Sequence, residues 1–414
     1  DVSVSGADTN YAALFSGGDV GIGGTPTSGG SGSTLHIKNN LYLGSAGATH
    51  GSINSSDSIF INMNANGGTE NTVIAFTEGA TGTSGTAIFK IDYNSRISLS
   101  NNDSGTDNTV FGDNAGNNIA SGGNQNTFIG DYAGHSNTTG DDNTYIGKSA
   151  GQANSGTGDD NTFIGSYSGY QLTGGSTNTA VGRSSLVSIT SSSNNVAIGA
   201  YAADAITTGA NNSVLGTSAL STATTVLNSV FIGKSAGEDI AASVALNGVV
   251  AIGWEAFKGS GSTTTDAEGT VAIGYEAGKA LTAAEKNTLV GYQAGKAIIG
   301  GGHNTALGAQ ALDELTTGTF NTALGRQALG SLDGGESGNT AVGYQALSNL
   351  DGIDGQTAMG YKALTGCTTG SANLAIGWEA MKTNTTGVRN IAIGYASMND
   401  TDAGRTSLGS SDNI

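Results

Sequence analysis

The chain has 414 residues, among them 69 Gly, one Pro and one Cys, and only 12% of its residues are charged. Gly falls far short of the one-third share that a collagen helix requires, and a hydrophobic content of 36% is too high for a chain kept disordered by its charge. The 15 basic and 33 acidic residues give a net charge of −18, which disfavours nucleic acid and anionic membrane surfaces as partners. The composition therefore predicts an ordered, turn-rich protein.

The first part of the chain lacks the periodicity of the rest. Residues 1–34 are a Gly/Ser-rich lead-in segment, and residues 35–106 contain alternating stretches at Ser58–Asn62 and Thr86–Asp92. Such alternation is typical of strands, so we expect a small β-module over 35–106.

From residue 107 to 414 the sequence is a repeat of about 17 residues. The segments Asn108–Gly112 and Asn126–Gly130 fix its phase. The Gly that ends this segment recurs 18 times, mostly 17 or 18 residues apart. Its positions are Gly112, Gly130, Gly147, Gly165, Gly182, Gly199, Gly216, Gly233, Gly253, Gly274, Gly291, Gly308, Gly325, Gly343, Gly360, Gly377, Gly394 and Gly409.

Each position of the repeat suggests a structural role. The residue before the Gly is always apolar, and two residues earlier stands Thr, Val, Ser, Leu or Ile; we expect this pair to face the core. Asn leads the strand in 13 of 18 repeats, which predicts an internal Asn ladder. Ala three residues after the Gly in 14 repeats predicts a tight site, and a second Gly seven residues before it in 10 repeats predicts a turn with positive φ.

Seventeen residues are too few for a pair of helices, so one repeat is expected to form one coil with two short strands and two turns. The fold class is therefore predicted to be all-β, a β-solenoid of about 18 coils preceded by the β-module. With strands about 4.8 Å apart, the rod would be about 85 Å long.

Aromatic residues occupy two positions of the repeat. Two residues before the Gly they occur in the first half, at Phe128, Tyr145, Phe163 and Phe231. Directly after the Gly they occur in the second half, at Trp254, Tyr275, Tyr292, Tyr344, Tyr361, Trp378 and Tyr395. No repeat is aromatic at both positions, so we expect the two columns to compete for one space between chains of a symmetric oligomer. The alternative is an exposed aromatic column, whose second-half members would be candidates for stacking against a ligand.

The unit N-T-x-h-G-x-x-A, in which h is aliphatic, resembles the head repeats of trimeric autotransporter adhesins (YadA-like). Asn195–Gly199 and Val271–Gly274 are close matches, although the period of about 17 is longer than in that family. The longer units Asn304–Leu312, Asn321–Leu329 and Asn339–Leu347 resemble repeats of bacteriophage tail fibres. The resemblance implies a left-handed β-roll packed as a parallel homotrimer.

Two junctions also resemble those of tail-fibre proteins, namely Gly18–Thr27 with the following Leu35–Lys38, and Leu408–Ile414 near the end of the chain. The resemblance implies a tail-fibre shaft of the virion tail, with other virion tail proteins and a bacterial surface glycan or protein receptor as partners. The runner-up is the head of a bacterial adhesin at the cell surface. A third class, a polysaccharide-cleaving tail spike, would need paired carboxylates at a fixed separation, and we find no such pair.

Sequence patterns for catalysis or metal binding are weak. Gly147–Gly151 and Gly233–Gly237 fit G-x-S-x-G, but their Ser occupies a variable repeat position, and the Gly-Lys-Ser core lacks the upstream Gly of a phosphate loop. The four His are scattered, Cys367 stands alone, and the acidic pairs at 141–142 and 159–160 lack a calcium-binding nonapeptide. We expect no enzyme activity, no cofactor, no metal site and no membrane insertion.

Overall fold

The computed structural model describes residues 105–399 except 121, 154–156, 243–244, 262–266, 332–333, 350–351 and 384, together with the backbone of three earlier strands. Those strands, β1 (Val73–Thr81), β2 (Ser84–Asp92) and β3 (Ile97–Ser98), pair antiparallel in the order β1-β2-β3. They fall within the segment 35–106. The lead-in 1–34, most of the β-module and the last repeat at Gly409 lie outside the described residues.

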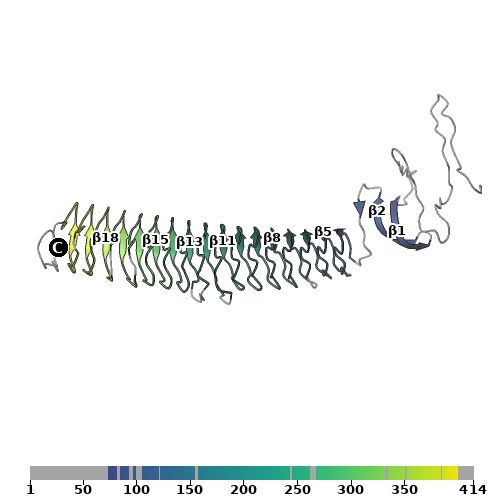
Figure 1. The fold of residues 1–414 in the computed structure, drawn as a ribbon, viewed down its shortest axis with the longest axis horizontal. Helices are drawn as coiled ribbons and strands as arrows, with labels where there is room; N and C mark the ends of the chain where they lie inside the picture. The colour runs from purple at the N-terminus through teal and green to yellow at the C-terminus, as the bar shows by residue number, and fades with distance from the viewer. Residues whose placement is uncertain are drawn as a thin grey trace, which may run out of the picture. The chain divides into compact units, whose positions relative to one another are not determined.

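The repeat region folds as a parallel β-solenoid (Figure 1). Each strand pairs in parallel with the strand of the next coil, so that equal repeat positions lie side by side, as Leu215 does with Ile232. The 17 strands bound 16 complete turns, a rod about 77 Å long at about 4.8 Å per turn. The strands are β4 (Thr109–Phe111), β5 (Thr127–Ile129), β6 (Thr144–Ile146), β7 (Thr162–Ile164), β8 (Thr179–Val181), β9 (Val196–Ile198), β10 (Ser213–Leu215), β11 (Val230–Ile232), β12 (Val250–Ile252), β13 (Val271–Ile273), β14 (Thr288–Val290), β15 (Thr305–Leu307), β16 (Thr322–Leu324), β17 (Thr340–Val342), β18 (Thr357–Met359), β19 (Leu374–Ile376) and β20 (Ile391–Ile393).

The predicted β-solenoid and its period are confirmed, but each described coil contains one three-residue strand rather than two. The rest of the coil is a series of turns that bond to the neighbouring coils. The Ser218 N–H donates to the Ala200 carbonyl at 3.0 Å, and the Leu220 N–H donates to the Ala236 carbonyl at 2.9 Å. Turn backbone is thus satisfied between coils, as strand backbone is.

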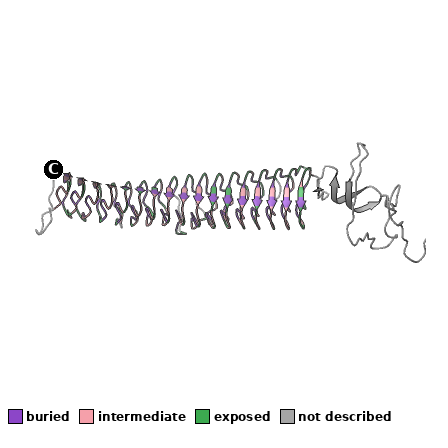
Figure 2. Ribbon diagram, turned by 90° about the horizontal axis from the view of Figure 1, so that it is seen from above, coloured by how far each residue is buried: buried purple, intermediate pink, exposed green. Residues whose placement is uncertain are grey.

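The predicted orientation of the strands is wrong. In every strand of the solenoid the middle residue is buried and its two neighbours are more exposed (Figure 2). In β7, Phe163 has no exposed surface, whereas Ile164 is 38% exposed. The apolar residue before the Gly therefore lies on the outside, because neighbouring residues of a strand point to opposite faces.

Two repeat positions share one space in the core: the middle strand residue and the residue six positions later. Where the middle residue is as large as Phe163, the later residue is Gly169, at which a Cβ would lie 2.3 Å from the Phe163 ring. Where the middle residue is Ala306, the later residue is Leu312, and both are fully buried. The exchange keeps one large side chain in this space in both kinds of coil.

The predicted internal Asn ladder is confirmed. Asn195 is almost fully buried, and its Nδ2 donates to the Gly209 carbonyl at 2.9 Å. Its Oδ1 accepts from the backbone N–H of Asn212 at 3.1 Å, while its own backbone N–H donates to Asn178 Oδ1 at 3.0 Å. The side-chain amide therefore satisfies two backbone groups of the next coil, and the amide of the preceding coil does the same for its own, which explains why so many repeats keep it.

Two Gly positions of the repeat, the strand-end Gly and the Gly seven residues before it, allow neighbouring coils to approach closely. Gly216, after β10, has φ +143°, and a Cβ there would lie 2.4 Å from the Gly233 carbonyl oxygen. The turn Gly seven residues before the strand-end Gly was predicted to supply positive φ, and this is wrong for Gly209. A Cβ at Gly209 would meet the Val226 carbonyl oxygen at 2.3 Å, whereas the left-handed residue is Asn211, with φ 59°.

We expect Asn195→Ala to lower the free energy of unfolding by about 1–3 kcal/mol, because it leaves buried backbone groups without partners. Thr208→Ala, at an exposed position of the same coil, is the matched control and should change it by less than about 0.5 kcal/mol. Denaturant unfolding followed by circular dichroism measures both. Equal effects of the two substitutions would contradict a structural role for the ladder.

Candidate functional site

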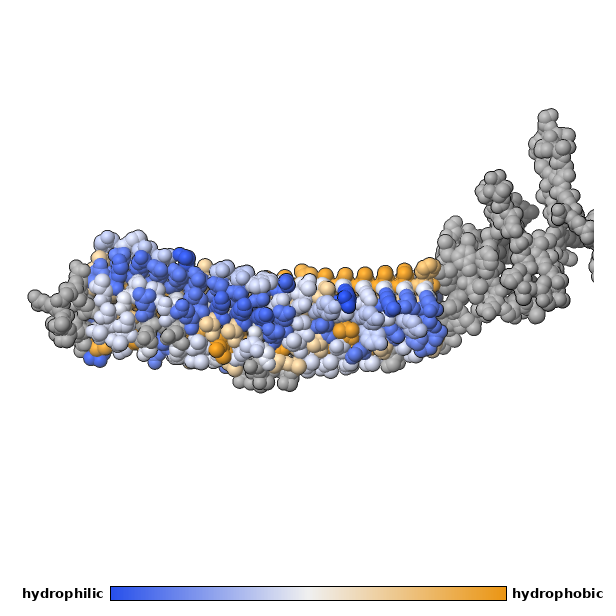
Figure 3. Space-filling model, in the orientation of Figure 1, coloured by the Kyte–Doolittle hydropathy of each residue, from blue (hydrophilic) through white to orange (hydrophobic). Residues whose placement is uncertain are grey.

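An apolar row runs along the outer face of the strands. It consists of the residue before the strand-end Gly in each coil, which was predicted to lie in the core. We call it the aliphatic row. Its exposed fractions include 38% at Ile198, 46% at Leu215 and 67% at Ile393. In Figure 3 an orange ridge along the upper edge of the rod marks its N-terminal part. The row comprises Phe111, Ile129, Ile146, Ile164, Val181, Ile198, Leu215, Ile232, Ile252, Ile273, Val290, Leu307, Leu324, Val342, Met359, Ile376 and Ile393.

The first-half aromatic residues lie inside the chain and do not compete with the second-half column. Phe128, Tyr145, Phe163 and Phe231 are fully buried. Phe128 stacks on Tyr145 and Tyr145 on Phe163, each pair with ring centroids 5.0 Å apart. Their predicted place between chains is wrong, because the middle strand position points into the core of its own coil.

The second-half aromatic residues form a partly exposed column directly after the strand-end Gly. We call it the aromatic column. Trp254 stacks on Tyr275 at 4.8 Å, and Tyr275 stacks on Tyr292 at 5.1 Å. A second run continues with Tyr344, Tyr361 and Trp378, whose centroids are 5.3 and 4.0 Å apart, and Tyr395 follows at 80% exposure.

Self-stacking limits what the aromatic column can bind. Tyr275 and Tyr361 have a ring on each face, so they present only their edges outward. A ligand ring can stack only where a run ends. The predicted candidates for ligand stacking are thereby reduced to the end residues of each run.

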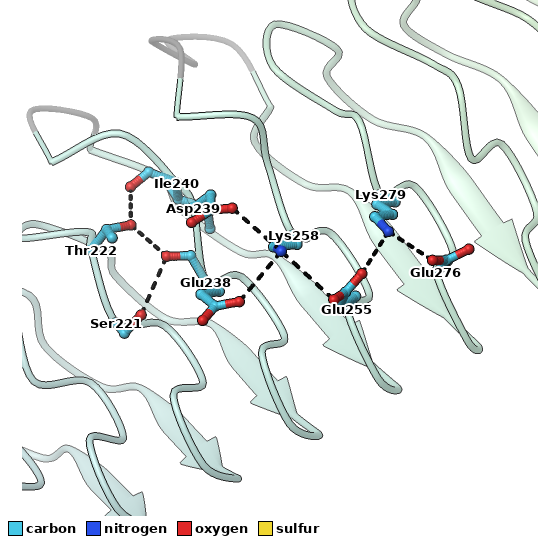
Figure 4. Close-up of polar contacts among 9 residues, drawn as sticks. All are labelled: Ser221, Thr222, Glu238, Asp239, Ile240, Glu255, Lys258, Glu276 and Lys279. Carbon is cyan, nitrogen blue, oxygen red and sulfur yellow. Dashed lines mark hydrogen bonds and ion pairs between the residues drawn. The ribbon is translucent and has the colours of Figure 1, made fainter.

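Beside the aromatic column, charged side chains form a ladder of ion pairs (Figure 4). They occupy the positions two and five residues after the strand-end Gly. Lys258 lies 3.6 Å from Glu255, and Lys279 lies 2.6 Å from Glu255 and 2.7 Å from Glu276. Lys296 extends the ladder, 3.1 Å from Glu276. Each position carries the same sign in successive coils, and Lys279, which bridges Glu255 and Glu276, offsets the repulsion between these stacked like charges.

A groove of about 610 Å³ continues from this ladder toward the C-terminal coils. Polar side chains line it, and Gly and Ala at neighbouring positions leave the space open. An adjoining groove of about 200 Å³ shares Gln310, Asp313 and Glu314 with it and reaches Gln327 and Gln345. The larger groove is lined by Gly259, Ser260, Lys279, Ala280, Gln293, Lys296, Ala297, Gln310, Asp313 and Glu314.

Two carboxylates, Glu276 beside the groove and Asp313 in its lining, have pKa values shifted in opposite directions. Burial opposes ionisation of Glu276, but hydrogen bonds from Lys279, Gln293 and Lys296 outweigh it and lower its pKa to about 2. At Asp313 burial dominates and raises the pKa to about 6. The groove is therefore lined by one carboxylate that takes up a proton in mildly acidic solution, while the firmly ionised Glu276 pairs with its two Lys residues.

The described residues contain no arrangement typical of a catalytic or metal centre. Ser149 and Ser235 lie in coil turns with φ 56° and 58°, not in a strand-to-helix elbow. Cys367 is fully buried, and burial raises its thiol pKa to about 11. Across the described part of the chain, no group of three His, Cys, Asp or Glu residues is placed to hold a metal ion.

Within the described ranges, no helix is long and apolar enough to cross a membrane.

A scan of protein-family models finds no match to the chain, and a search of curated proteins finds no relative. The aliphatic row, the aromatic column and the groove are therefore identified as candidate functional surfaces from the geometry of the chain. Sequence reasoning missed the groove, although a signal was present: Glu276, Gln293, Gln310, Gln327 and Gln345 all stand two residues after the strand-end Gly.

We expect opposite effects from neutralising the two carboxylates. The pKa of Glu276 is lowered from 4.5 to about 2, so its contribution to stability is present above pH 4.5 and lost toward pH 2. Glu276→Gln should therefore lower the free energy of unfolding at neutral pH by about 1–2 kcal/mol.

The pKa of Asp313 is raised from 3.8 to about 6, so its ionisation disfavours the folded state as the pH rises through that range. Asp313→Asn should stabilise the protein above pH 6 by about 1 kcal/mol after solvent screening, and not below pH 3.8. Thermal unfolding at acidic and neutral pH measures both variants, and the same sign for both at neutral pH would contradict the assignment.

Proposed function

We propose that the chain is the self-associating shaft of an attachment fibre, a tail fibre of a bacteriophage that contacts the surface of a bacterial cell. The aliphatic row carries this proposal. A continuous row of apolar side chains along the whole rod is unusual on a protein that works as a single chain, and it is the property expected of a rod that packs against others.

The size of the aliphatic row suits a specific interface. Its 17 side chains, at roughly 50 Å² exposed apiece, present on the order of 850 Å², close to the roughly 800 Å² that each partner buries in a standard interface. At 25 cal/mol per Å² this area corresponds to about 20 kcal/mol before the costs of association. Self-association therefore has sufficient driving force.

Matching periodicity favours another copy of the chain as the partner. Side chains of the aliphatic row recur at the strand spacing over 17 strands, and another copy in parallel presents the same spacing along the same length. Closed symmetry then lets every copy bury its row against the others. We propose a parallel homotrimer, the arrangement that the resemblance to adhesin heads and tail fibres implies.

A rod of this kind works mechanically. It holds binding surfaces away from the particle, where they meet a glycan or protein of the host surface, while other virion tail proteins anchor the fibre. The head of a bacterial adhesin would use the same rod at a cell surface. The tail-fibre proposal rests on units such as Asn304–Leu312, which resemble repeats of bacteriophage tail fibres.

We expect light scattering to give the mass of three chains for the full chain. Ile198→Glu combined with Leu324→Glu, two exposed sites of the aliphatic row in distant coils, should shift it toward the mass of one chain, since charge would be buried in the interface. Thr208→Glu combined with Thr317→Glu adds the same charge at exposed turn positions and should leave the mass unchanged. A folded wild-type chain that is monomeric at micromolar concentration would refute the proposal.

A further inference from the structure

The aromatic column is interrupted in a way that leaves one ring face open. Tyr275 covers one face of Tyr292 at 5.1 Å with an interplanar angle of 10°. In the next coil the same repeat position holds Ala309. Tyr292 is accordingly 51% exposed, against 41% for Tyr275, which has a ring on both faces. Ala309 therefore opens a slot next to the Tyr292 ring.

The far wall of this slot is Arg326, which holds the same repeat position one coil further on. Its guanidinium lies 5.7 Å from the Tyr344 ring centroid, and its Nη1 donates to Tyr344 Oη at 3.5 Å. Arg326 thus closes the start of the second aromatic run. Two strand spacings, about 9.6 Å, separate the coils of Tyr292 and Arg326, which leaves room for one ring at the spacing that the column itself uses.

The slot lies one residue along the chain from the groove. Gln293 and Gln310, which follow Tyr292 and Ala309 in the chain, line the groove, and the Gln310 N–H donates to the Tyr292 carbonyl at 2.8 Å. The groove thus offers amide, carboxylate and ammonium groups beside an open aromatic face. Such groups both donate and accept hydrogen bonds.

The charges of the groove favour an uncharged ligand. Lys279 and Lys296 balance Asp313 and Glu314 among its lining residues, and both Lys are already paired with Glu276. A phosphate-bearing or strongly acidic ligand would find no excess of positive charge. A ligand with an apolar ring face and many hydroxyl groups matches both the slot and the groove.

We propose that the slot over Ala309 and the adjoining groove bind a neutral oligosaccharide, with one sugar ring stacked on Tyr292 and its neighbours hydrogen-bonded along the row of Gln293, Gln310 and Gln327. The proposal deepens the attachment role proposed above by assigning a ligand class to one stretch of the rod, and it rests on that role. The groove does not include the aliphatic row, so binding and self-association can be tested separately.

The test uses the full chain and four neutral probes, namely maltohexaose, cellohexaose, mannohexaose and chitohexaose, in saturation-transfer NMR and calorimetry. At least one probe should bind at millimolar concentration. Ala309→Tyr fills the slot with a ring that five other coils carry at this position and should weaken binding by about tenfold or more. Ala200→Tyr, the same change at the same repeat position away from the groove, is the matched control and should not affect it.

Two further variants separate the ring face from the phenol group. Tyr292→Phe keeps the apolar face and should retain binding, whereas Tyr292→Ala should lose it to about the same extent as Ala309→Tyr. Saturation of the Tyr292 ring protons should transfer to the sugar C–H protons. Loss of binding in Tyr292→Phe would contradict a stacked sugar.

The possible outcomes are distinct. No transfer to any neutral probe, or equal binding by Ala309→Tyr and the wild type, overturns the proposal, and so does binding confined to an acidic probe such as oligogalacturonate. Light scattering on the same samples reports self-association independently. A monomer that binds the probe would refute the shaft and leave this site standing, whereas a trimer that binds no probe would do the reverse.

Discussion

The alignment of equal positions from coil to coil governs the whole rod. Parallel pairing in register places each side chain beside the same repeat position of the next coil, at about 4.8 Å. Only groups that tolerate a copy of themselves at that distance can recur: amides that bond to one another's backbone, aliphatic groups, stacked rings, Gly and Ala. Where charges of one sign recur, as in Glu255 and Glu276, a side chain of opposite sign such as Lys279 lies between them. The low charge and high Gly content of the chain follow from this single constraint.

Periodicity predicted the fold but not which face of the strand is buried. The spacing of the Gly residues predicted the coils and their in-register pairing, and the recurrence of Asn predicted the ladder, because both need only the linear pattern. A strand of three residues, such as Thr162–Ile164, carries apolar side chains on both faces. Alternation alone then does not decide which of the two faces is buried. The prediction chose the face of the hydrophobic residue before the Gly, which in the structure is the outer face.

The feature that identifies the buried face is an exchange of side-chain volume between two positions of the repeat. Aromatic residues at the middle position do compete for one space, as the sequence suggested, but with the residue six positions later. Phe163 faces Gly169, and Ala306 faces Leu312. The sequence pattern did not predict the groove, for a related reason. Its lining comes from turn positions, where side-chain direction depends on the left-handed φ of residues such as Gln293 and Gln310, and no pattern of hydrophobicity reports that.

Ala309 illustrates how a repetitive rod can acquire function by leaving something out. A ring inside a stacked run has no free face, and one small residue in the next coil leaves a face of Tyr292 open. The coil that carries the small residue sets where the open ring face lies. Substitutions at this one repeat position can therefore move the open face along the rod in steps of one strand spacing, without any change to the core. The fold would then allow a binding site to change its distance from the ends of the rod while the packing and length of the shaft stay the same.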